Sequence, residues 1–141
     1  PVIPAGVTDM SSCFLNCTAL VQAPAIPEGV TNMNGCFAGC TSLVQAPAIP
    51  AGVTDMQLCF SGCTSLVQAV IPASVTDMEA CFSGCTALKT VEVKTTSCTS
   101  WDCCFINCPA ITKITVPNQD VKDRILAANS DITASQIVIQ P

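Results

Sequence analysis

A sequence of 22 or 23 residues recurs along most of this chain and restricts its fold more than any other feature. Residues 20–42 (LVQAPAIPEGVTNMNGCFAGCTS) and 43–65 (LVQAPAIPAGVTDMQLCFSGCTS) match at most positions, and residues 66–87 (LVQAVIPASVTDMEACFSGCTA) are one residue shorter. Residues 88–110 are a diverged copy, and residues 1–19 are the back part of an earlier one. One short repeat cannot bury an apolar face alone, whereas stacked repeats can, so the period predicts a solenoid.

Each repeat predicts the same succession of short elements. A strand-like segment begins at a leucine column and ends at a proline, where a strand tolerates ending. A column of Asp, Asn and Ser then suits the N-cap of a helical turn. Only Gly or Asn stands two residues after each Phe, which indicates a left-handed residue that ends the turn. The cap column is Asp9, Asn32, Asp55, Asp77 and Ser100, and the Gly/Asn column is Asn16, Gly39, Gly62, Gly84 and Asn107.

The tail departs from the period. Residues 111–117 (ITKITVP) predict the strand of a last rung. Residues 118–129 place Val121, Ile125 and Leu126 at helical spacing, and residues 135–141 (SQIVIQP) predict a further strand. We therefore expect five repeats over residues 1–110, the first of them partial, and a last rung with a C-terminal cap over residues 111–141.

Charge and composition exclude several classes of function. The net charge is −5, and all five basic residues fall after residue 88. An acidic repeat body without a basic patch argues against nucleic acid or an anionic membrane as partner. No apolar run approaches the roughly 20 residues that a membrane span needs. The chain has no His to act as the base of a nucleophilic triad and no phosphate loop, so we expect no catalytic residue, cofactor or enzymatic activity.

Cysteine is the most unusual part of the composition, with twelve residues. Such heavy usage is typical of an oxidising, extracellular setting with a disulfide framework. Two columns are filled together, which favours a bridge within each repeat, and the alternative is two columns of buried reduced thiols. Zinc is disfavoured because C-x-x-x-C is not its usual spacing. The candidate pairs are Cys13 and Cys17, Cys36 and Cys40, Cys59 and Cys63, Cys81 and Cys85, and Cys104 and Cys108, with Cys98 and Cys103 as an extra pair.

Two polar patterns have competing interpretations. A threonine column at residues 8, 31, 54, 76 and 99 could order water as in ice-binding proteins, but single threonines beside turns also bond locally. Asn16-Cys17-Thr18 fits the glycosylation sequon, and Asn16 also belongs to the left-handed column.

The repeated motif V-T-[DN]-M-x-x-C-F-x-[GN]-C-[TP]-x-L resembles the BspA-type (treponemal-type) leucine-rich repeat. The resemblance covers residues 1–117 and implies a parallel β-solenoid with short helical turns. It also implies a secreted or cell-surface bacterial protein, usually an adhesin that binds host or matrix proteins, and it carries over no catalytic residue. Two departures stand out. The first Cys column usually holds Ala in the family, and the strand is rich in Ala and Pro, so its pairing is expected to be weaker.

The strand face is the expected binding surface for a protein partner. A Val-Gln ladder marks it: Val21, Gln22, Val44, Gln45, Val67 and Gln68. The alternative function is self-assembly, because the sequence opens partway through a repeat and an uncapped end invites another chain. Head-to-tail contacts of this kind would give an oligomer or fibre. The expected assembly contacts are Pro1, Val2 and Ile3 at one end, and Ile137, Val138 and Ile139, a spare C-terminal strand, at the other.

Overall fold

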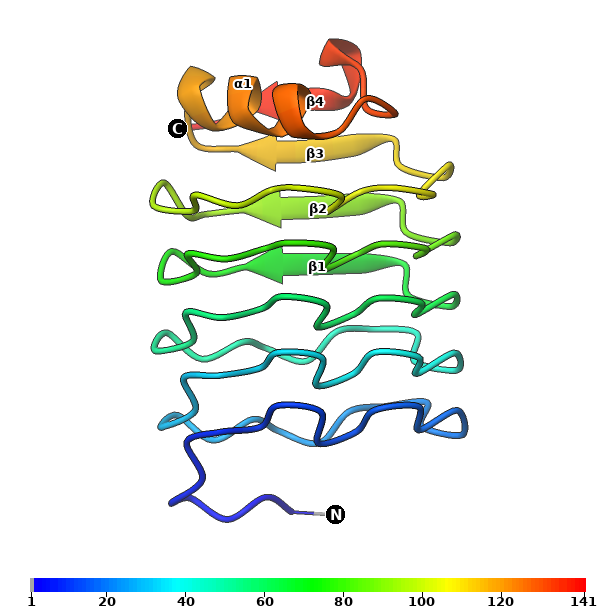
Figure 1. Ribbon diagram of the computed structural model, residues 1–141, viewed down its shortest axis with the longest axis vertical. Coiled ribbons are helices and arrows are strands. Elements are labelled where there is room, and N and C mark those ends of the chain that lie inside the picture. Colours follow the sequence, from blue (N-terminus) through cyan, green and yellow to red (C-terminus); the bar gives the residue numbers. More distant parts are fainter. Residues whose placement is uncertain (1) are drawn as a thin grey trace.

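The computed structural model describes residues 2–141, so Pro1, one of the expected assembly contacts, lies outside the described residues. The chain winds into one elongated stack, with its first residues at one end and its C-terminal elements at the other (Figure 1). One side carries a parallel sheet in the order β1-β2-β3-β4. Its strands are β1 (Gln68–Ile71), β2 (Thr90–Val93), β3 (Lys113–Val116) and β4 (Ile137–Ile139). The fold is the predicted parallel solenoid of leucine-rich-repeat type.

The sheet is continuous only in the later repeats. In residues 20–42 and 43–65 it is reduced to single bridges, from Gln22 to Gln45 and from Gln45 to Gln68. These repeats place Pro24 and Pro47 two residues after the bridge, and proline has no N–H with which to continue a ladder. The shorter repeat has Val70 there, and β1 forms. The expectation of weak strand pairing is therefore confirmed for the Pro-containing repeats.

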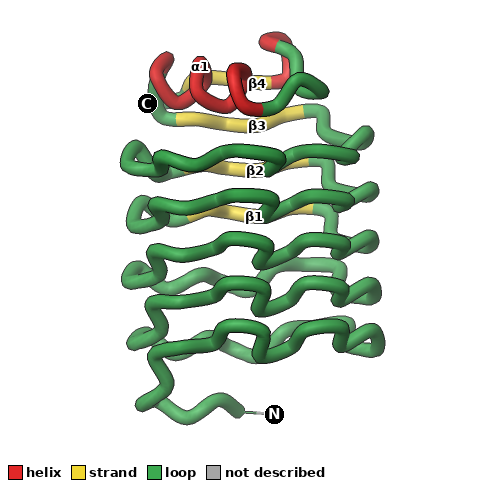
Figure 2. The backbone as a smooth tube through the Cα atoms, in the orientation of Figure 1, coloured by secondary structure: helices red, strands yellow, loops and turns green. Residues whose placement is uncertain are grey.

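The other side of the stack is a ribbon of consecutive turns (Figure 2). Successive backbone N–H groups of this ribbon donate alternately to the following repeat and to their own repeat. The N–H groups of Met33, Gly35 and Phe37 donate to carbonyls of the following repeat, whereas Cys36 donates to Met33 three residues back. Because every second donor leaves the repeat, the i→i−4 pattern of an α-helix cannot form. The predicted helical turn is therefore wrong, although the residues that mark it are placed as predicted.

The Asp/Asn column still accepts backbone N–H groups. The Asn32 carboxamide oxygen accepts from Asn34 at 2.9 Å, and the Asp55 carboxylate accepts from Gln57 at 2.9 Å. Each side chain thus stabilises the start of a turn two residues on, rather than a helix. The same residues pair in a second parallel ladder, from Asp9 through Asn32, Asp55 and Asp77 to Ser100.

Left-handed residues fix the path of the ribbon. The Gly/Asn column is left-handed as predicted, with φ from 58° at Asn16 and Asn107 to 75° at Gly84. A second left-handed column, four residues earlier, was not predicted, because its residue types vary. Its members are Ser12, Gly35, Leu58, Ala80 and Cys103.

Stacked side chains fill the core between the sheet and the ribbon. Phe14, Phe37, Phe60, Phe82 and Phe105 form one continuous pile, with centroids 5.3–5.8 Å apart and nearly parallel rings. Neighbouring columns of Met, Leu and Cys are also buried.

The tail covers the last repeat. Helix α1 (Gln119–Ala128) begins at Asn118, whose side chain accepts from Val121, and it buries Val121 and Ile125. The short 3₁₀ helix η1 (Ala134–Gln136) leads into β4. Asn129 is buried beyond α1 and accepts from the Phe105 N–H at 3.0 Å. In earlier repeats the corresponding N–H bonds to the next repeat, so Asn129 takes the place of that carbonyl.

Candidate binding face

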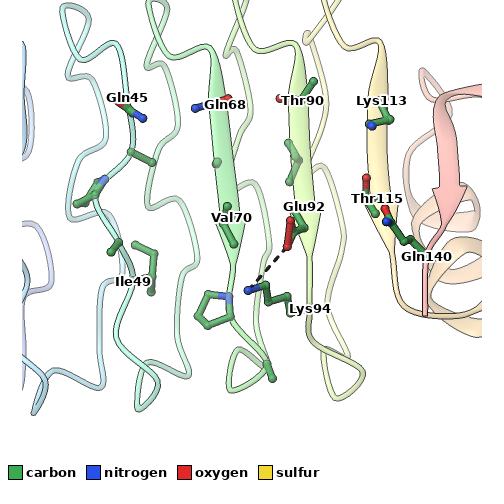
Figure 3. Close-up of a pocket in the computed structure, with 17 residues that line it drawn as sticks. Gln45, Ile49, Gln68, Val70, Thr90, Glu92, Lys94, Lys113, Thr115 and Gln140 are labelled. Atoms are coloured by element: carbon green, nitrogen blue, oxygen red, sulfur yellow. Dashed lines mark ion pairs between the residues drawn. The ribbon is translucent and has the colours of Figure 1, made fainter.

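A groove of about 730 Å³ runs across the strand side of the stack (Figure 3). Four consecutive repeats contribute to it through one column in register, Gln45, Gln68, Thr90 and Lys113. Strand alternation explains why these side chains face outward, since Ala69 and Val91, one residue further on, point into the core.

The structure places the predicted binding residues on this face, but only some of them line the groove. Gln45 and Gln68 line it, and both are exposed. Val21 and Val44 are 61% and 47% exposed and lie outside the groove lining, as do exposed Gln22 and half-buried Val67.

Sequence reasoning missed the part of the groove that lies on β1, β2 and β3. Val70, Glu92 and Thr115 form a second outward column there, in register across the three strands. Val70 is 50% exposed, which is high for a large apolar side chain. The available signal was the alternation of polar and apolar residues in residues 90–93 and 113–116, whereas residues 68–71 (QAVI) carry no such signal.

The two ends of the groove differ in chemistry. Toward the N-terminal repeats, Ala46, Pro47 and Ile49 line it together with Pro72. Toward the C-terminal repeats, the lining is Glu92, Lys94, Lys113, Thr115 and Gln140. Lys94 lies 3.8 Å from Glu92, and the two side chains are 57% and 50% exposed, so this pair contributes little to stability.

All twelve cysteines are free thiols in the structure, so the predicted bridges within each repeat are not present in it. The thiols of the second column turn toward the preceding repeat. Cys63 Sγ donates to the Phe37 carbonyl at 3.1 Å, and Cys85 Sγ donates to the Phe60 carbonyl at 3.0 Å. The same contact recurs at Cys40 and Cys108. This direction differs from the bridge that the sequence predicted.

Burial makes most of these thiols poor nucleophiles. Desolvation raises the pKa of Cys36 and of Cys63 to about 12 and that of Cys98 to about 11. Because the thiolate is the reactive form, such groups are inert near neutral pH. Cys13 and Cys103 are the exposed thiols among the twelve. Within residues 2–141, no cluster of three His, Cys, Asp or Glu side chains is arranged to hold a metal ion.

The expected assembly contacts lie at opposite ends of the stack (Figure 1). Val2 is 94% exposed and Ile3 is half-buried. The segment expected to be a spare strand is β4, which pairs in parallel with β3 of its own chain. The Ile137 N–H bonds to Ala134, its carbonyl accepts from Lys122, and its side chain is buried, while Val138 and Ile139 are exposed. This strand is therefore already used within the fold.

The threonine column behaves as a turn element. The hydroxyls of Thr31, Thr54, Thr76 and Thr99 each donate to the threonine carbonyl of the preceding repeat, at 3.3–3.5 Å. Asn16, the sequon residue, is exposed and left-handed. Its side chain lies over Gly39 of the next repeat, at a position that a Cβ would occupy.

No helix of the described residues has the length and hydropathy required to cross a bilayer.

Comparison with known proteins places these repeats in a family. No curated protein matches this chain. A solved leucine-rich repeat protein from Bacteroides ovatus shares 22% identity with it at a TM-score of 0.49, and the match covers 82% of this chain but 38% of that one. The family model of the BspA type leucine rich repeat region matches residues 8–133 in six copies. Proteins of this family are typically surface-associated in bacteria, and their repeats generally mediate protein interactions rather than catalysis. Since the family model matches most of its length, the chain belongs to the BspA-type leucine-rich repeat family.

Proposed function

We propose that this chain is a non-enzymatic adhesion module of the bacterial cell surface, and that its strand-side groove holds a protein partner. The observation that carries this proposal is the groove itself, which exposes Gln45, Gln68 and Val70 on two consecutive repeats. Repeat stacks bind partners through extended surfaces of this kind.

The scaffold suits a binding role because it holds the face rigidly. The ribbon bonds the backbone of each repeat to its neighbour on one side of the core, and on the other side β1, β2 and β3 are paired in one sheet. A pre-formed face loses little conformational entropy when a partner binds. The one acidic side chain of the groove, Glu92, is next to Lys94, an arrangement that offers no acid–base pair for catalysis.

The direct test is binding of the purified chain to a panel of immobilised host matrix proteins. A blocking variant, Val70→Arg, fills the groove from β1 without touching the core, because Val70 points outward. The matched control is Thr76→Arg, a change at an exposed residue of the threonine column, which is not part of the groove lining. We expect saturable binding that Val70→Arg reduces at least tenfold and that Thr76→Arg leaves unchanged, about 1.4 kcal/mol of difference.

Equal binding by the two variants would place the contact elsewhere on the stack. The absence of saturable binding to every member of the panel would count against adhesion to host matrix.

A further inference from the structure

Two of the five basic residues of this acidic chain make no ion pair within residues 2–141, and both lie in its C-terminal half. Of the five basic residues, Arg124 pairs with Asp120 at 2.8 Å, Lys94 lies beside Glu92, and Lys122 donates to the Ile137 carbonyl at 3.1 Å. Lys89 and Lys113 are exposed and make no ion pair with any residue from 2 to 141. Their backbones are neighbours, since the Lys89 carbonyl accepts from the Lys113 N–H. Lys113 projects from β3 into the groove (Figure 3).

We propose that the partner of this groove is an extended protein segment that carries an acidic residue at one end and an apolar, proline-tolerant stretch at the other. This proposal rests on the proposed function and gives the class of its partner. The acidic side chain faces Lys113. The apolar stretch lies on Pro47, Ile49 and Pro72, a part of the lining without charge.

The spacing of the repeats sets the length of this segment. From Gln45 to Lys113 the register column crosses three inter-repeat steps. At about 4.8 Å per step the two ends lie about 14 Å apart, and an extended chain advances about 3.3 Å per residue. The acidic residue is therefore expected about four residues from the apolar residue that lies over the repeat of Pro47 and Ile49. Lys113, the lysine of the groove without an ion pair among residues 2–141, matches one carboxylate, and such a charge is too small for a nucleic-acid backbone, whose binding proteins neutralise many phosphates.

The test is selection of a random twelve-residue peptide library against the intact chain, followed by affinity measurement on the enriched peptides. We expect enrichment of Asp or Glu about four positions from Val, Ile, Leu or Pro. Lys113→Gln should weaken binding of such a peptide about two- to fivefold, which is the range of one exposed ion pair. The charge-matched control is Arg124→Gln, on the outer face of α1, which should leave affinity unchanged.

A gain of affinity provides a readout that misfolding cannot imitate. Glu92→Gln removes the carboxylate beside Lys94 and frees a second cation in the groove, so affinity for the acidic peptide should rise about two- to fivefold. Raising the salt concentration should weaken wild-type binding more than binding by Lys113→Gln.

The outcomes separate this proposal from the function on which it rests. Enriched peptides without acidic residues, or equal affinities for wild type and Lys113→Gln, would overturn the acidic segment while leaving a peptide-binding groove. Peptides whose binding survives Val70→Arg, or a selection that enriches none, would remove the groove as a binding site.

Discussion

The thiol of Cys63 donates to the carbonyl oxygen of Phe37 in the preceding repeat, at 3.1 Å, and both residues are fully buried. The same carbonyl accepts the Cys40 N–H at 3.1 Å. Cys63, a small residue with a weak hydrogen-bond donor, therefore lies at the junction between two repeats. The contact joins the cysteine column to the phenylalanine column, which links the composition of this chain to the stacking of its repeats.

Removal of this thiol should lower stability. Cys63→Ala loses the bond to Phe37 and leaves a small void, so we expect the free energy of unfolding to fall by about 1–2 kcal/mol. Urea unfolding with excess reductant measures this change. Cys103→Ala is the control, because Cys103 is exposed, and it should stay within about 0.5 kcal/mol of wild type. Similar losses for the two variants would show that the buried contact has no special weight.

The thiols should differ sharply in their rates of alkylation. In the folded chain at pH 8, iodoacetamide should modify exposed Cys13 and Cys103 first and half-buried Cys17 more slowly, while the nine buried thiols react only after unfolding. Mass spectrometry of peptides gives the order. A denatured sample without reductant should take up twelve labels, and any lower number would restore the disulfide pairing that the sequence predicted.

Stability should fall at alkaline pH. Burial raises the pKa of Cys36 and Cys63 from 9.0 to about 12, so the unfolded chain releases these protons at lower pH than the folded chain does. Their contribution is complete below pH 9 and is lost as pH rises from about 9 toward 12. Urea midpoints between pH 8 and 11, under argon with reductant, should decline.

The variant Cys36→Ala/Cys63→Ala isolates the contribution of these two thiols to the alkaline loss of stability. Its midpoint should be lower at pH 8 but should decline less steeply with pH than that of wild type. Parallel curves would assign the alkaline loss to other groups.

At a left-handed position, substitution of Gly by Asn should lower stability less than substitution by Ala. Gly62 has φ of +73°, and a Cβ there would meet only ordinary contacts with Gly39, so the cost of Gly62→Ala is backbone strain of about 1–2 kcal/mol. Gly62→Asn should cost less, because Asn tolerates this conformation and its side chain could lie over Gly84 as Asn16 lies over Gly39. Thermal unfolding of both variants tests the order, and a larger loss for Asn would contradict it.

Asn129, which covers the last repeat, should contribute more to the free energy of unfolding than the size of its side chain suggests. Asn129 bonds to Phe105, Trp101 and Ile125 at 3.0–3.1 Å inside the core, so Asn129→Leu leaves several buried polar groups without partners. We expect a loss of about 2–4 kcal/mol in urea unfolding. Ser130→Ala, at the exposed neighbour, should change stability by less than about 0.5 kcal/mol. A small effect of Asn129→Leu would show that water reaches these groups.

Those parts of the fold that depend on residue type within one repeat could be predicted from the sequence. The Gly/Asn column predicted left-handed residues because few other side chains accept positive φ. The helical turn was wrong because the partners of Gly35 and Phe37 lie in another repeat, 22 residues further along the chain, and a local pattern does not report them. Leu58 and Ala80 gave no sign of their positive φ, since neither residue type favours it.

The binding face was half predictable for a related reason. The Gln ladder was visible because identical residues recur at Gln45 and Gln68. Val70 and Lys113 could not be identified in this way. They lie in the later repeats, which lack the proline and form strands, and there they align with other residue types. The two cysteine columns are filled together in each repeat. This pattern fits two separate buried sites as well as it fits a bridge between them.

In the ribbon, the backbone bonds between repeats are nearly the same at each junction, and residues 20–42 and 43–65 are nearly the same sequence. A gene that gained or lost one such segment by unequal recombination would encode a stack one step longer or shorter, with every remaining junction unchanged. Reach could then evolve in discrete increments of about 4.8 Å without a new core having to be selected.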